Sequence, residues 1–260
     1  MRENQYIAES RGRSTASAAG VHYAHSDVAQ SRMIAELGTL MEAGARRFCD
    51  VGGGANPIVS SRKIDQLGLE YVILDDSPGE LGKAPAGYET FRASVLDGGR
   101  MSELLRERGA FDVVASRWAA EHMPDGHAFH RQVFEMLKPG GAAVHLFPTL
   151  YSPVFLANRV LPPALSSALL ERGSMGGRSE DGRHAKFRSY YSWCRGPSTR
   201  QLARLQRVGF TIERYIGFFG HGYYRRVKPI DRLHRVVTDA LIAHPLASMT
   251  SFALVVLRRP

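Results

Sequence analysis

Short apolar runs alternate with amphipathic stretches over most of the 260-residue chain. Residues 1–20 show no periodicity, and apolar side chains then recur at helical spacing from His25 to Met41. Strands are predicted at Arg46–Val51, Tyr71–Leu74, Tyr88–Ala93, Phe111–Ala115 and Ala142–Phe147, with intervening helices at Asn56–Leu67, Met101–Arg108 and Gly126–Leu137. Because strands and helices that alternate in this way are joined by right-handed crossovers, the pattern predicts an α/β fold with a parallel sheet.

The alternation breaks from Pro148 to Pro197 and then resumes. It predicts a helix at Thr199–Val208, a strand at Phe210–Phe219, a helix at Ile230–Ala243 and a strand at Met249–Leu257. We therefore expect a Rossmann-like, mostly parallel seven-stranded sheet flanked by helices, with cap insertions. The expected parts are an N-terminal arm and helix that serve as a lid (1–44), a core (45–147), a cap insertion (148–197), and a C-terminal part of the core (198–260). A second cap insertion is expected at about 220–247, because long connections in compact domains tend to be functional.

Composition excludes several classes of protein. Hydrophobic residues make up 44% of the chain, enough for a core, yet no apolar run reaches the roughly 18 residues of a membrane span. The polar start of the chain has no apolar signal region, and Cys49 and Cys194 are too few for a disulfide framework. These features predict a cytoplasmic protein with free thiols and without a membrane span.

The net charge of +9 is unevenly distributed. Residues 1–150 carry 16 Lys and Arg against 19 Asp and Glu, whereas residues 151–260 carry 18 against 6. A basic half can attract nucleic acid, anionic lipid or an acidic small molecule, but it can equally be a solvated surface. The charge alone does not choose between these interpretations.

The strongest local signal is a glycine-rich loop, Gly52-Gly53-Gly54, which follows the first predicted strand of the core and precedes a helix. Glycines allow a tight turn and let a ligand approach the main-chain amides closely. Asp75 ends the next strand, 23 residues after Gly52, where a carboxylate can accept hydrogen bonds from both ribose hydroxyls. The alternatives are an ordinary tight turn and a solvated strand end.

The chemistry of the loop discriminates between nucleotides. Pro57 removes an amide where the pyrophosphate of a dinucleotide would lie, and Asp50, two residues before the first glycine, would repel a phosphate. The same carboxylate favours a cationic amino-acid cofactor without phosphate. S-adenosyl-L-methionine, which carries a sulfonium and an ammonium group, is therefore the expected cofactor.

The segment from about residue 45 to 147 resembles the class I S-adenosylmethionine-dependent methyltransferases, in particular bacterial enzymes of small-molecule metabolism. Four motifs carry the resemblance: the loop at 50–56, the second-strand segment 72–78, the fourth-strand segment 111–116, and the Lys-Pro-Gly-Gly turn at 138–141. The resemblance implies that the cofactor is bound by Asp50, Gly52, Gly53, Gly54, Asn56, Asp75, Asp76, Ser94, Val95, Ser116 and Arg117. Two positions depart from the family pattern. The adenine site reads Ala93-Ser94-Val95 instead of carrying an acid, and Asp76 replaces an apolar residue.

Glu121 and His122 follow the fourth strand and resemble a Glu-His pair found there in many small-molecule methyltransferases. Methyl transfer from a sulfonium needs alignment of nucleophile, methyl and sulfur, and a hydroxyl nucleophile is helped by a general base such as histidine. We therefore predict His122 and Glu121 as catalytic residues. The alternative is a histidine that only packs or caps. Trp118 occupies the position of the first acid of a metal-binding pattern in related O-methyltransferases, so no metal is expected.

Aromatic residues beyond the core suit the lining of a planar substrate. The expected substrate-binding residues are Trp118, Tyr190, Tyr191, His221, Tyr223 and Tyr224, although packing between cap and core would explain most of them equally well. We expect methylation of oxygen or nitrogen in a small molecule, such as a bacterial secondary metabolite or a saccharide or lipid precursor, by a monomer or homodimer.

Three rival functions differ in class. A nucleic-acid methyltransferase is disfavoured, and no nucleic-acid partner is expected, because Ser116-Arg117-Trp118-Ala119 stands where base methyltransferases carry a Pro-Pro motif. A dehydrogenase is disfavoured by Pro57 and Asp50. A non-methylating enzyme that binds the same cofactor, such as a cyclase, stays open, because fold does not fix function.

Overall fold

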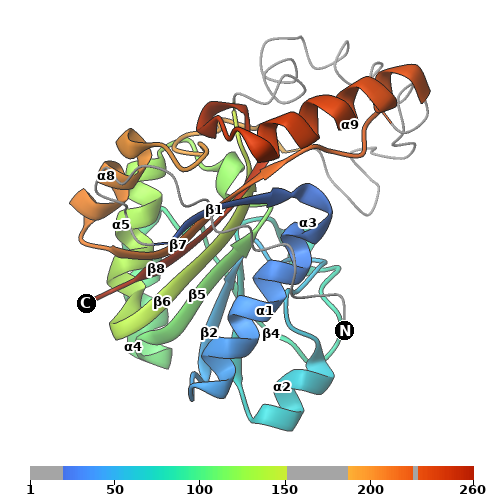
Figure 1. Cartoon of the computed structure of the whole chain (residues 1–260). Helices are drawn as coiled ribbons and strands as arrows, with labels where there is room; N and C mark the ends of the chain where they lie inside the picture. The colour runs from blue at the N-terminus through green and yellow to red at the C-terminus, as the bar shows by residue number, and fades with distance from the viewer. Residues whose placement is uncertain (1–19, 151–186, 225–227) are drawn as a thin grey trace.

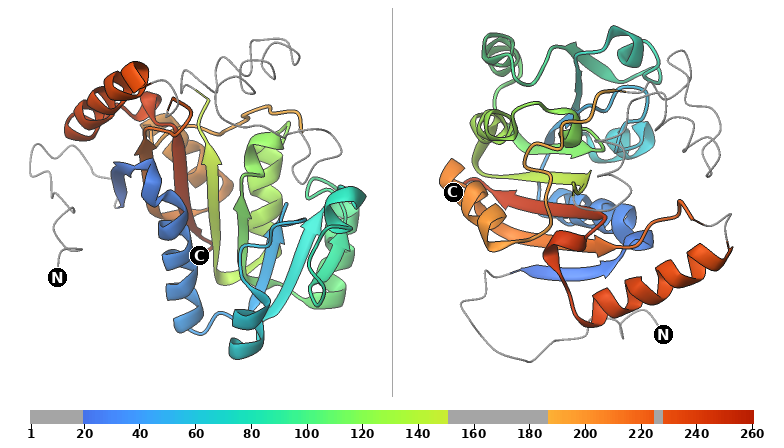
Figure 2. Two further views of the ribbon diagram at one scale, coloured as in Figure 1. Left: turned by 90° about the vertical axis from the view of Figure 1, so that its right-hand side faces the viewer. Right: turned by 90° about the horizontal axis from the view of Figure 1, so that it is seen from above.

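The computed structural model describes residues 20–150, 187–224 and 228–260, which form an α/β unit around one twisted sheet (Figures 1 and 2). Its strands are β1 (Val21–His25), β2 (Arg47–Val51), β3 (Glu70–Asp75), β4 (Glu89–Arg92), β5 (Phe111–Arg117), β6 (Leu137–Pro148), β7 (Thr211–Phe219) and β8 (Phe252–Arg258). Their order in the sheet is β1-β7-β8-β6-β5-β2-β3-β4. Only β8 runs antiparallel to its neighbours, so the Rossmann-like, mostly parallel α/β fold expected from the sequence is confirmed.

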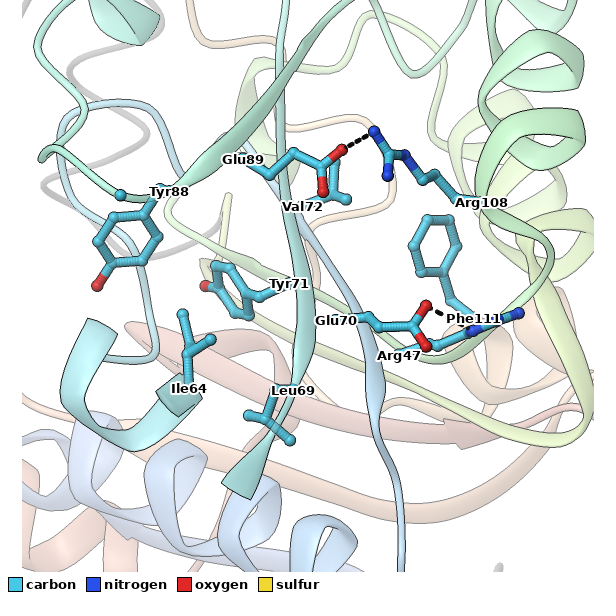
Figure 3. A pocket seen from close by; sticks show the side chains of 11 residues that line it. Arg47, Ile64, Leu69, Glu70, Tyr71, Val72, Tyr88, Glu89, Arg108 and Phe111 are labelled. Carbon is cyan, nitrogen blue, oxygen red and sulfur yellow. Dashed lines mark ion pairs between the residues drawn. The ribbon is translucent and has the colours of Figure 1, made fainter. Parts of the chain in front are cut away.

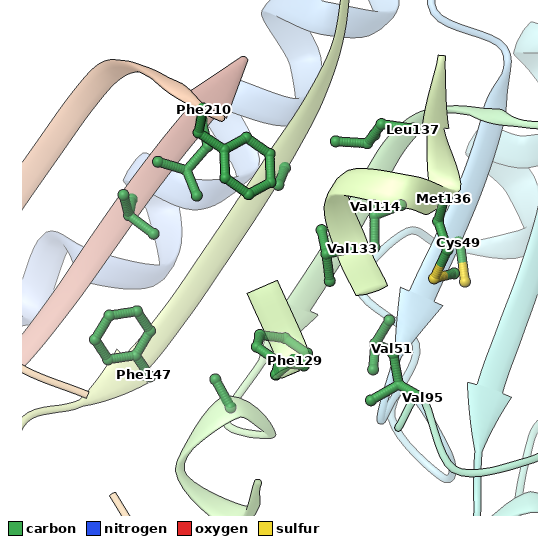
Figure 4. Close-up of a cluster of buried hydrophobic side chains, with 14 of the residues drawn as sticks. Cys49, Val51, Val95, Val114, Phe129, Val133, Met136, Leu137, Phe147 and Phe210 are labelled. Carbon is green, nitrogen blue, oxygen red and sulfur yellow. The ribbon is translucent and has the colours of Figure 1, made fainter. Parts of the chain in front are cut away.

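Helices cover both faces of the sheet. They are α1 (Ala29–Glu42), α2 (Ser61–Leu67), α3 (Pro78–Leu81), α4 (Gly98–Arg108), α5 (Gly126–Met136), α8 (Thr199–Val208) and α9 (Lys228–Ala243). Three 3-10 turns accompany them, η1 (Ser26–Val28), η2 (Ala120–His122) and η3 (Ala247–Met249). On one face α1 buries Met33, Leu37 and Met41 against the sheet. On the other face α4, α5 and α8 cover a second cluster that includes Phe129 and Val133 (Figure 4). These two apolar layers hold the ends of the central strands in place.

The sheet has one strand more than expected, because β1 occupies residues that the sequence pattern divided between an arm and a helix. β1 pairs in parallel with β7 at the edge of the sheet, from Val21 opposite Tyr215 to His25 opposite Phe219. Tyr23 stacks on Phe219 with ring centroids 5.5 Å apart. A strand of five residues at an edge is too short to show a clear period of two, so only its partner strand identifies it.

The helix predicted at Asn56–Leu67 begins later than expected. The helix α2 starts at Ser61, after an N-cap at Ser60 in the extended conformation, and ends at the left-handed Gly68. The amide of Ile58 instead donates a hydrogen bond to the carboxylate of Asp50. Asn56 and Pro57 therefore belong to the loop, and the expectation that they open the helix was wrong.

The region predicted as a second cap insertion carries α9. This helix lies across the end of the sheet where the parallel strands finish, and it contacts β1 and β7 (Figures 1 and 2). Most of the first predicted insertion, 148–197, and nearly all of the predicted N-terminal arm lie outside the described residues. The division into core, lid and caps therefore stays a prediction.

Candidate functional site

The parallel strands bring the predicted cofactor residues together at one edge of the sheet, which we call the carboxyl edge. Val51 at the end of β2 lies opposite Leu74 of β3 and Ser116 of β5. Asp75, the last residue of β3, lies opposite Arg92 of β4. Three features therefore meet at the carboxyl edge, where ligands bind in such sheets. They are the glycine loop, Asp75 at the end of β3, and the end of β5.

The glycine loop is closely packed at that edge. The amide of Gly52 donates to the carbonyl of Leu74 over 2.7 Å, and Gly52 and Gly54 have positive φ angles of 75° and 30°. A Cβ atom on Gly53 would lie 2.5 Å from Oδ2 of Asp50, and one on Gly54 would lie 2.9 Å from Oδ2 of Asp75. Only glycine fits at these positions, because the loop backbone passes directly between two carboxylates.

The carboxylate of Asp50 is buried beneath the loop. Its Oδ2 accepts hydrogen bonds from the Tyr71 hydroxyl at 2.5 Å and from the Ile58 amide at 2.9 Å, and its Oδ1 has no partner among the described residues. Burial raises the pKa of Asp50 to about 6, although the bonds from Tyr71 and Ile58 and the charge of Arg117 oppose the shift. An unpartnered buried oxygen of this kind suits a ligand with a positively charged or polar donor group.

Asp75 lies on the other side of the loop beside Glu80, a buried acid that sequence analysis missed. The amide of Ser77 donates to Oδ1 of Asp75 over 2.9 Å, and burial together with the charges of Asp76 and Glu80 raises the pKa of Asp75 to about 6. Glu80 stands third in the short helix α3, whose N-cap Ser77 accepts a bond from the Glu80 amide. The Ser-x-x-Glu spacing of a capping box could have revealed it.

Arg117 brings a positive charge to the glycine loop, where its guanidinium donates to the carbonyl of Asn56 over 3.1 Å. Neighbouring Ser116 points the other way: its hydroxyl is fully buried and lies 2.8 Å from Nδ1 of His145. Ser116 therefore offers only its main chain to the carboxyl edge. The bond from the Arg117 side chain to the Asn56 main chain ties the end of β5 to the glycine loop.

The residues predicted to lie at the adenine of the cofactor differ in their exposure to solvent. Asp76 is exposed, and Ser94 is half-buried with its hydroxyl accepting from the Leu96 amide. Val95 is buried in the apolar cluster beneath the sheet, beside Val51 and Cys49 (Figure 4). Its side chain is thus a core residue, which leaves its main chain as the part that a ligand can touch.

The predicted catalytic pair lies in the turn η2 just after β5. The carbonyl of Glu121 accepts bonds from the amides of Tyr190 and Tyr191, at 2.8 and 2.9 Å, so the chain after residue 187 is tied directly to this turn. Tyr191 is buried in the core with a φ of 52°, whereas Tyr190 is partly exposed. Packing rather than ligand contact explains Tyr191, the alternative that the sequence left open.

The surroundings fix the proton position on His122. Its Nδ1 lies 2.9 Å from the carbonyl of Arg188, which can only accept, so the proton is on Nδ1 and the lone pair is on Nε2. Burial lowers the pKa of His122, and Nε2 lies 3.9 Å from Oε1 of Glu121. Burial raises the pKa of Glu121 to about 8, and its Oε2 has no partner among the described residues. His122 is therefore a neutral imidazole with a free basic nitrogen at neutral pH.

A cavity of about 870 Å³, which we call the edge cavity, opens at the carboxyl edge between the sheet and α9. Trp118 and His221, two predicted substrate residues, line it together with His25, Asp231, His234 and Thr238. Trp118 has a φ of 58° and packs edge-on against Phe252. Sequence analysis missed the residues from β1 and α9, because only the tertiary structure brings those elements to this edge.

The histidines of the edge cavity form a compact group. His221 and His234 stack with centroids 4.1 Å apart, and the amide of His221 donates to Nε2 of His234. Tyr223 and Tyr224 pack against His221 with centroids at 5.2 and 4.8 Å. Burial and the neighbouring His234 lower the pKa of His221 to about 4, so it is neutral and its buried Nδ1 has no partner within the described part of the chain.

A smaller cavity of about 240 Å³ lies at the opposite end of the sheet (Figure 3). It is bordered by an ion pair between Arg47 and Glu70, 2.8 Å apart at the starts of β2 and β3, and by one between Arg108 and Glu89. Since ligands of open α/β sheets bind beyond the carboxyl ends of the strands, this cavity is separate from the candidate site.

Within residues 20–150, 187–224 and 228–260, no group of three or more His, Cys, Asp or Glu side chains is arranged to hold a metal ion. None of the helices in these ranges is long and apolar enough to cross a membrane.

The fit of S-adenosylmethionine to this chain rests on the residues of the carboxyl edge. The glycines of the loop put no side chain of their own over its main chain, and the unpartnered oxygen of Asp50 and the carboxylate of Asp75 lie beside it.

The fold and the site thus define a Rossmann-like nucleoside-binding unit that favours a cation over a phosphate. A family model described as a methyltransferase domain matches residues 22–215, most of the chain. The chain belongs to this family, which confirms the class I resemblance and S-adenosyl-L-methionine as the cofactor expected from the sequence.

Individual proteins of similar sequence are also described as methyltransferases. An uncharacterized methyltransferase of Mycobacterium sp. (strain KMS) is 31% identical over 124 residues, which cover 46% of this chain and 47% of that protein. A ubiquinone biosynthesis O-methyltransferase of Ruegeria pomeroyi is 29% identical over 131 residues, covering 48% and 52%. The matched segments span about half the length of these curated relatives.

Solved structures share the fold. A SAM-dependent methyltransferase from Archaeoglobus fulgidus superposes with a TM-score of 0.53 at 14% identity, covering 89% of this chain and 93% of that one. The N-methyltransferase NodS from Bradyrhizobium japonicum gives 0.51 at 11% identity, covering 90% and 98%. At these identities the likeness concerns the architecture of the sheet and its helices.

Proposed function

We propose that this chain transfers the methyl group of S-adenosylmethionine to an oxygen or nitrogen of a small molecule, such as a bacterial secondary metabolite or a saccharide or lipid precursor. We also propose that it acts in the cytoplasm as a monomer or homodimer. The observation that carries the proposal is the proton position on His122. Its free Nε2 can accept a proton from an acceptor hydroxyl or ammonium group, since burial keeps the ring neutral.

The cofactor, when bound, supplies an activated methyl group on a positively charged sulfur. The residues of this chain would bind and orient it: the main chain of Gly53 and Gly54 would pass beside the ligand, the carboxylate of Asp75 would accept bonds from ribose hydroxyls, and Asp50 would offer negative charge beneath the loop. The positive charge of the cofactor would stabilise the ionised form of Asp50, and hydrogen bonds from the ribose hydroxyls would do the same for Asp75; burial raises the pKa of each of these acids to about 6.

The acceptor site that we propose is the edge cavity together with the neighbouring turn η2. Trp118 and His221 provide aromatic and polar walls, and Tyr223 and Tyr224 support His221 from outside. A cavity of about 870 Å³ suits a molecule of drug size rather than a polymer. The similarity to an O-methyltransferase of quinone biosynthesis favours oxygen as the acceptor atom, and an aromatic alcohol suits these walls.

The test is a methyl-transfer assay with S-adenosylmethionine labelled on its methyl group and a panel of phenols, sugars, amines and RNA. We expect label to move to a phenol or another small acceptor, with release of S-adenosylhomocysteine, in wild type and much less in His122→Ala. Transfer to RNA alone would overturn the proposal. Release of a cofactor product other than S-adenosylhomocysteine would indicate the non-methylating alternative instead.

A further inference from the structure

The helix α9 turns polar side chains toward the protein and apolar side chains toward solvent. It buries Asp231 and Thr238 against the edge cavity, while Leu233 and Val236 are 65% and 61% exposed. A surface helix ordinarily turns its apolar stripe to the core and its polar residues to water. The reversed arrangement leaves an apolar face that the described residues do not cover.

The exposed apolar side chains are concentrated on this part of the molecule. Of the eight large apolar side chains that the described residues expose, six lie between 230 and 249: Ile230, Leu233, Val236, Val237, Leu246 and Met249. Ile230, Leu233 and Val237 follow one another at helical spacing, so they share one stripe of α9. We call these six residues the α9 patch. A grouping of this kind marks an interaction surface, since scattered single residues would need no explanation.

Basic side chains border the α9 patch. Lys228, Arg232 and Arg235 are exposed on the same helix, and Arg235 is held by Asp231 through its Nε over 2.9 Å. Asp239 is the one exposed acid of α9. An apolar stripe with a basic margin is the signature of a helix that lies in the surface of a bilayer containing anionic lipid.

We propose that α9 docks this protein on an anionic lipid surface, with the α9 patch inserted between headgroups and the basic margin against phosphates. Charge complementarity favours this occupant over a second copy of the chain, because two copies packed on this face would bring one basic margin toward another. The inner face of α9 lines the edge cavity, so docking through the outer face would hold that cavity one helix diameter, roughly 10 Å, from the membrane surface. The proposal stands independently of the proposed methyl transfer.

The test is flotation of the full chain with vesicles of phosphatidylcholine and phosphatidylglycerol, compared with phosphatidylcholine alone. We expect binding to the mixed vesicles that weakens with salt, and little binding to the neutral ones. The variant Leu233→Ser with Val236→Ser should bind at least about tenfold more weakly, because two exposed apolar side chains no longer enter the lipid. Arg232→Gln should weaken binding about fivefold.

Two matched variants control for general effects. Ile34→Ser removes an exposed apolar side chain from α1, and Arg62→Gln removes an exposed charge from α2; both should bind vesicles as wild type does. Binding of S-adenosylhomocysteine measured on every variant reports that the fold is intact. Absence of wild-type binding to the mixed vesicles would overturn the proposal, as would unchanged binding of the double variant. A concentration-dependent dimer that the double variant abolishes, without vesicle binding, would identify the patch as a contact between copies and would overturn it too.

Discussion

The hydroxyl of Tyr71, on β3, donates a 2.5 Å hydrogen bond to the buried carboxylate of Asp50, on β2. The amide of Ile58, near the end of the loop after β2, donates to the same oxygen and also lies 3.2 Å from the Tyr71 hydroxyl, so that end of the loop is held by side chains of β2 and β3. This bond connects the core to the cofactor loop. It also lowers the energetic cost of keeping a carboxylate under that loop.

The variant Tyr71→Phe should lower the free energy of unfolding by about 1–3 kcal/mol, because it leaves a buried acceptor with one donor fewer. It should also weaken binding of S-adenosylmethionine, since the loop and the Asp50 charge are less well held. Urea denaturation and calorimetric titration measure the two effects. Tyr88→Phe, which removes a bond to the Val59 carbonyl near the end of the same loop and away from Asp50, is the control and should weaken cofactor binding less than Tyr71→Phe does.

Asp75→Ala should weaken S-adenosylmethionine binding by roughly 1.5–3 kcal/mol, the scale for losing hydrogen bonds to a charged acceptor. The reason is the position of Asp75 at the carboxyl edge, with its Oδ2 directed at the loop backbone of Gly54. Calorimetric titration at neutral pH measures the change, and Asp65→Ala on the exposed side of α2 is the matched control. Unchanged affinity in Asp75→Ala would remove Asp75 from the ribose site.

Gly54→Ala should abolish or strongly reduce cofactor binding, because its Cβ would lie 2.8 Å from Cβ of Glu80 and 2.9 Å from Oδ2 of Asp75. Gly38→Ala is the control: a Cβ there meets nothing within 4 Å in the helix α1. That control should stabilise the protein by about 0.5–1 kcal/mol through helix propensity. Thermal unfolding with and without S-adenosylhomocysteine separates the two effects. Equal ligand-induced stabilisation in both variants would contradict the proposal that the cofactor binds at Gly54.

His122→Ala should reduce turnover by about a hundredfold or more with a hydroxyl acceptor, the usual effect of removing a positioned base. Cofactor affinity should barely change. In wild type, turnover should fall with decreasing pH at a pKa below the ordinary histidine value, because burial lowers the pKa of His122. The exposed His22, replaced by alanine, is the control. Near-normal turnover of a less stable His122→Ala protein would assign it a packing role.

Glu121→Gln should make the ligand-free protein less sensitive to alkaline pH. Burial raises the pKa of Glu121 to about 8, so the folded state disfavours the charged form. Its protonation therefore favours the fold at low pH, and that contribution is lost as the pH rises from the unfolded value near 4.5 through about 8. Between pH 6 and 9 the melting temperature of wild type should fall more than that of Glu121→Gln. The exposed Glu107→Gln should behave as wild type does.

The sequence determined the core of the fold and the position of the glycine loop within it. The glycines after β2, the acid that ends β3 and the strand–helix alternation are local patterns, and the parallel strands that follow from them must end at one edge. Because each signal lies within a few residues, periodicity and turn chemistry were enough to place Gly54 and Asp75 at the same edge of the sheet.

Only the tertiary structure decided the edge strand, the burial of several predicted site residues and the outward face of α9. The segment β1 forms a strand only because it pairs with β7. The burial of Ser116, Val95 and Tyr191 depends on neighbours far along the chain. The proton on His122 is placed by a carbonyl 66 residues away. The periodicity of α9 predicted a helix correctly, but not that its polar side would face the protein and its apolar side the solvent. A periodic pattern fixes which residues share a face of a helix, whereas the elements packed around that helix decide which face is buried.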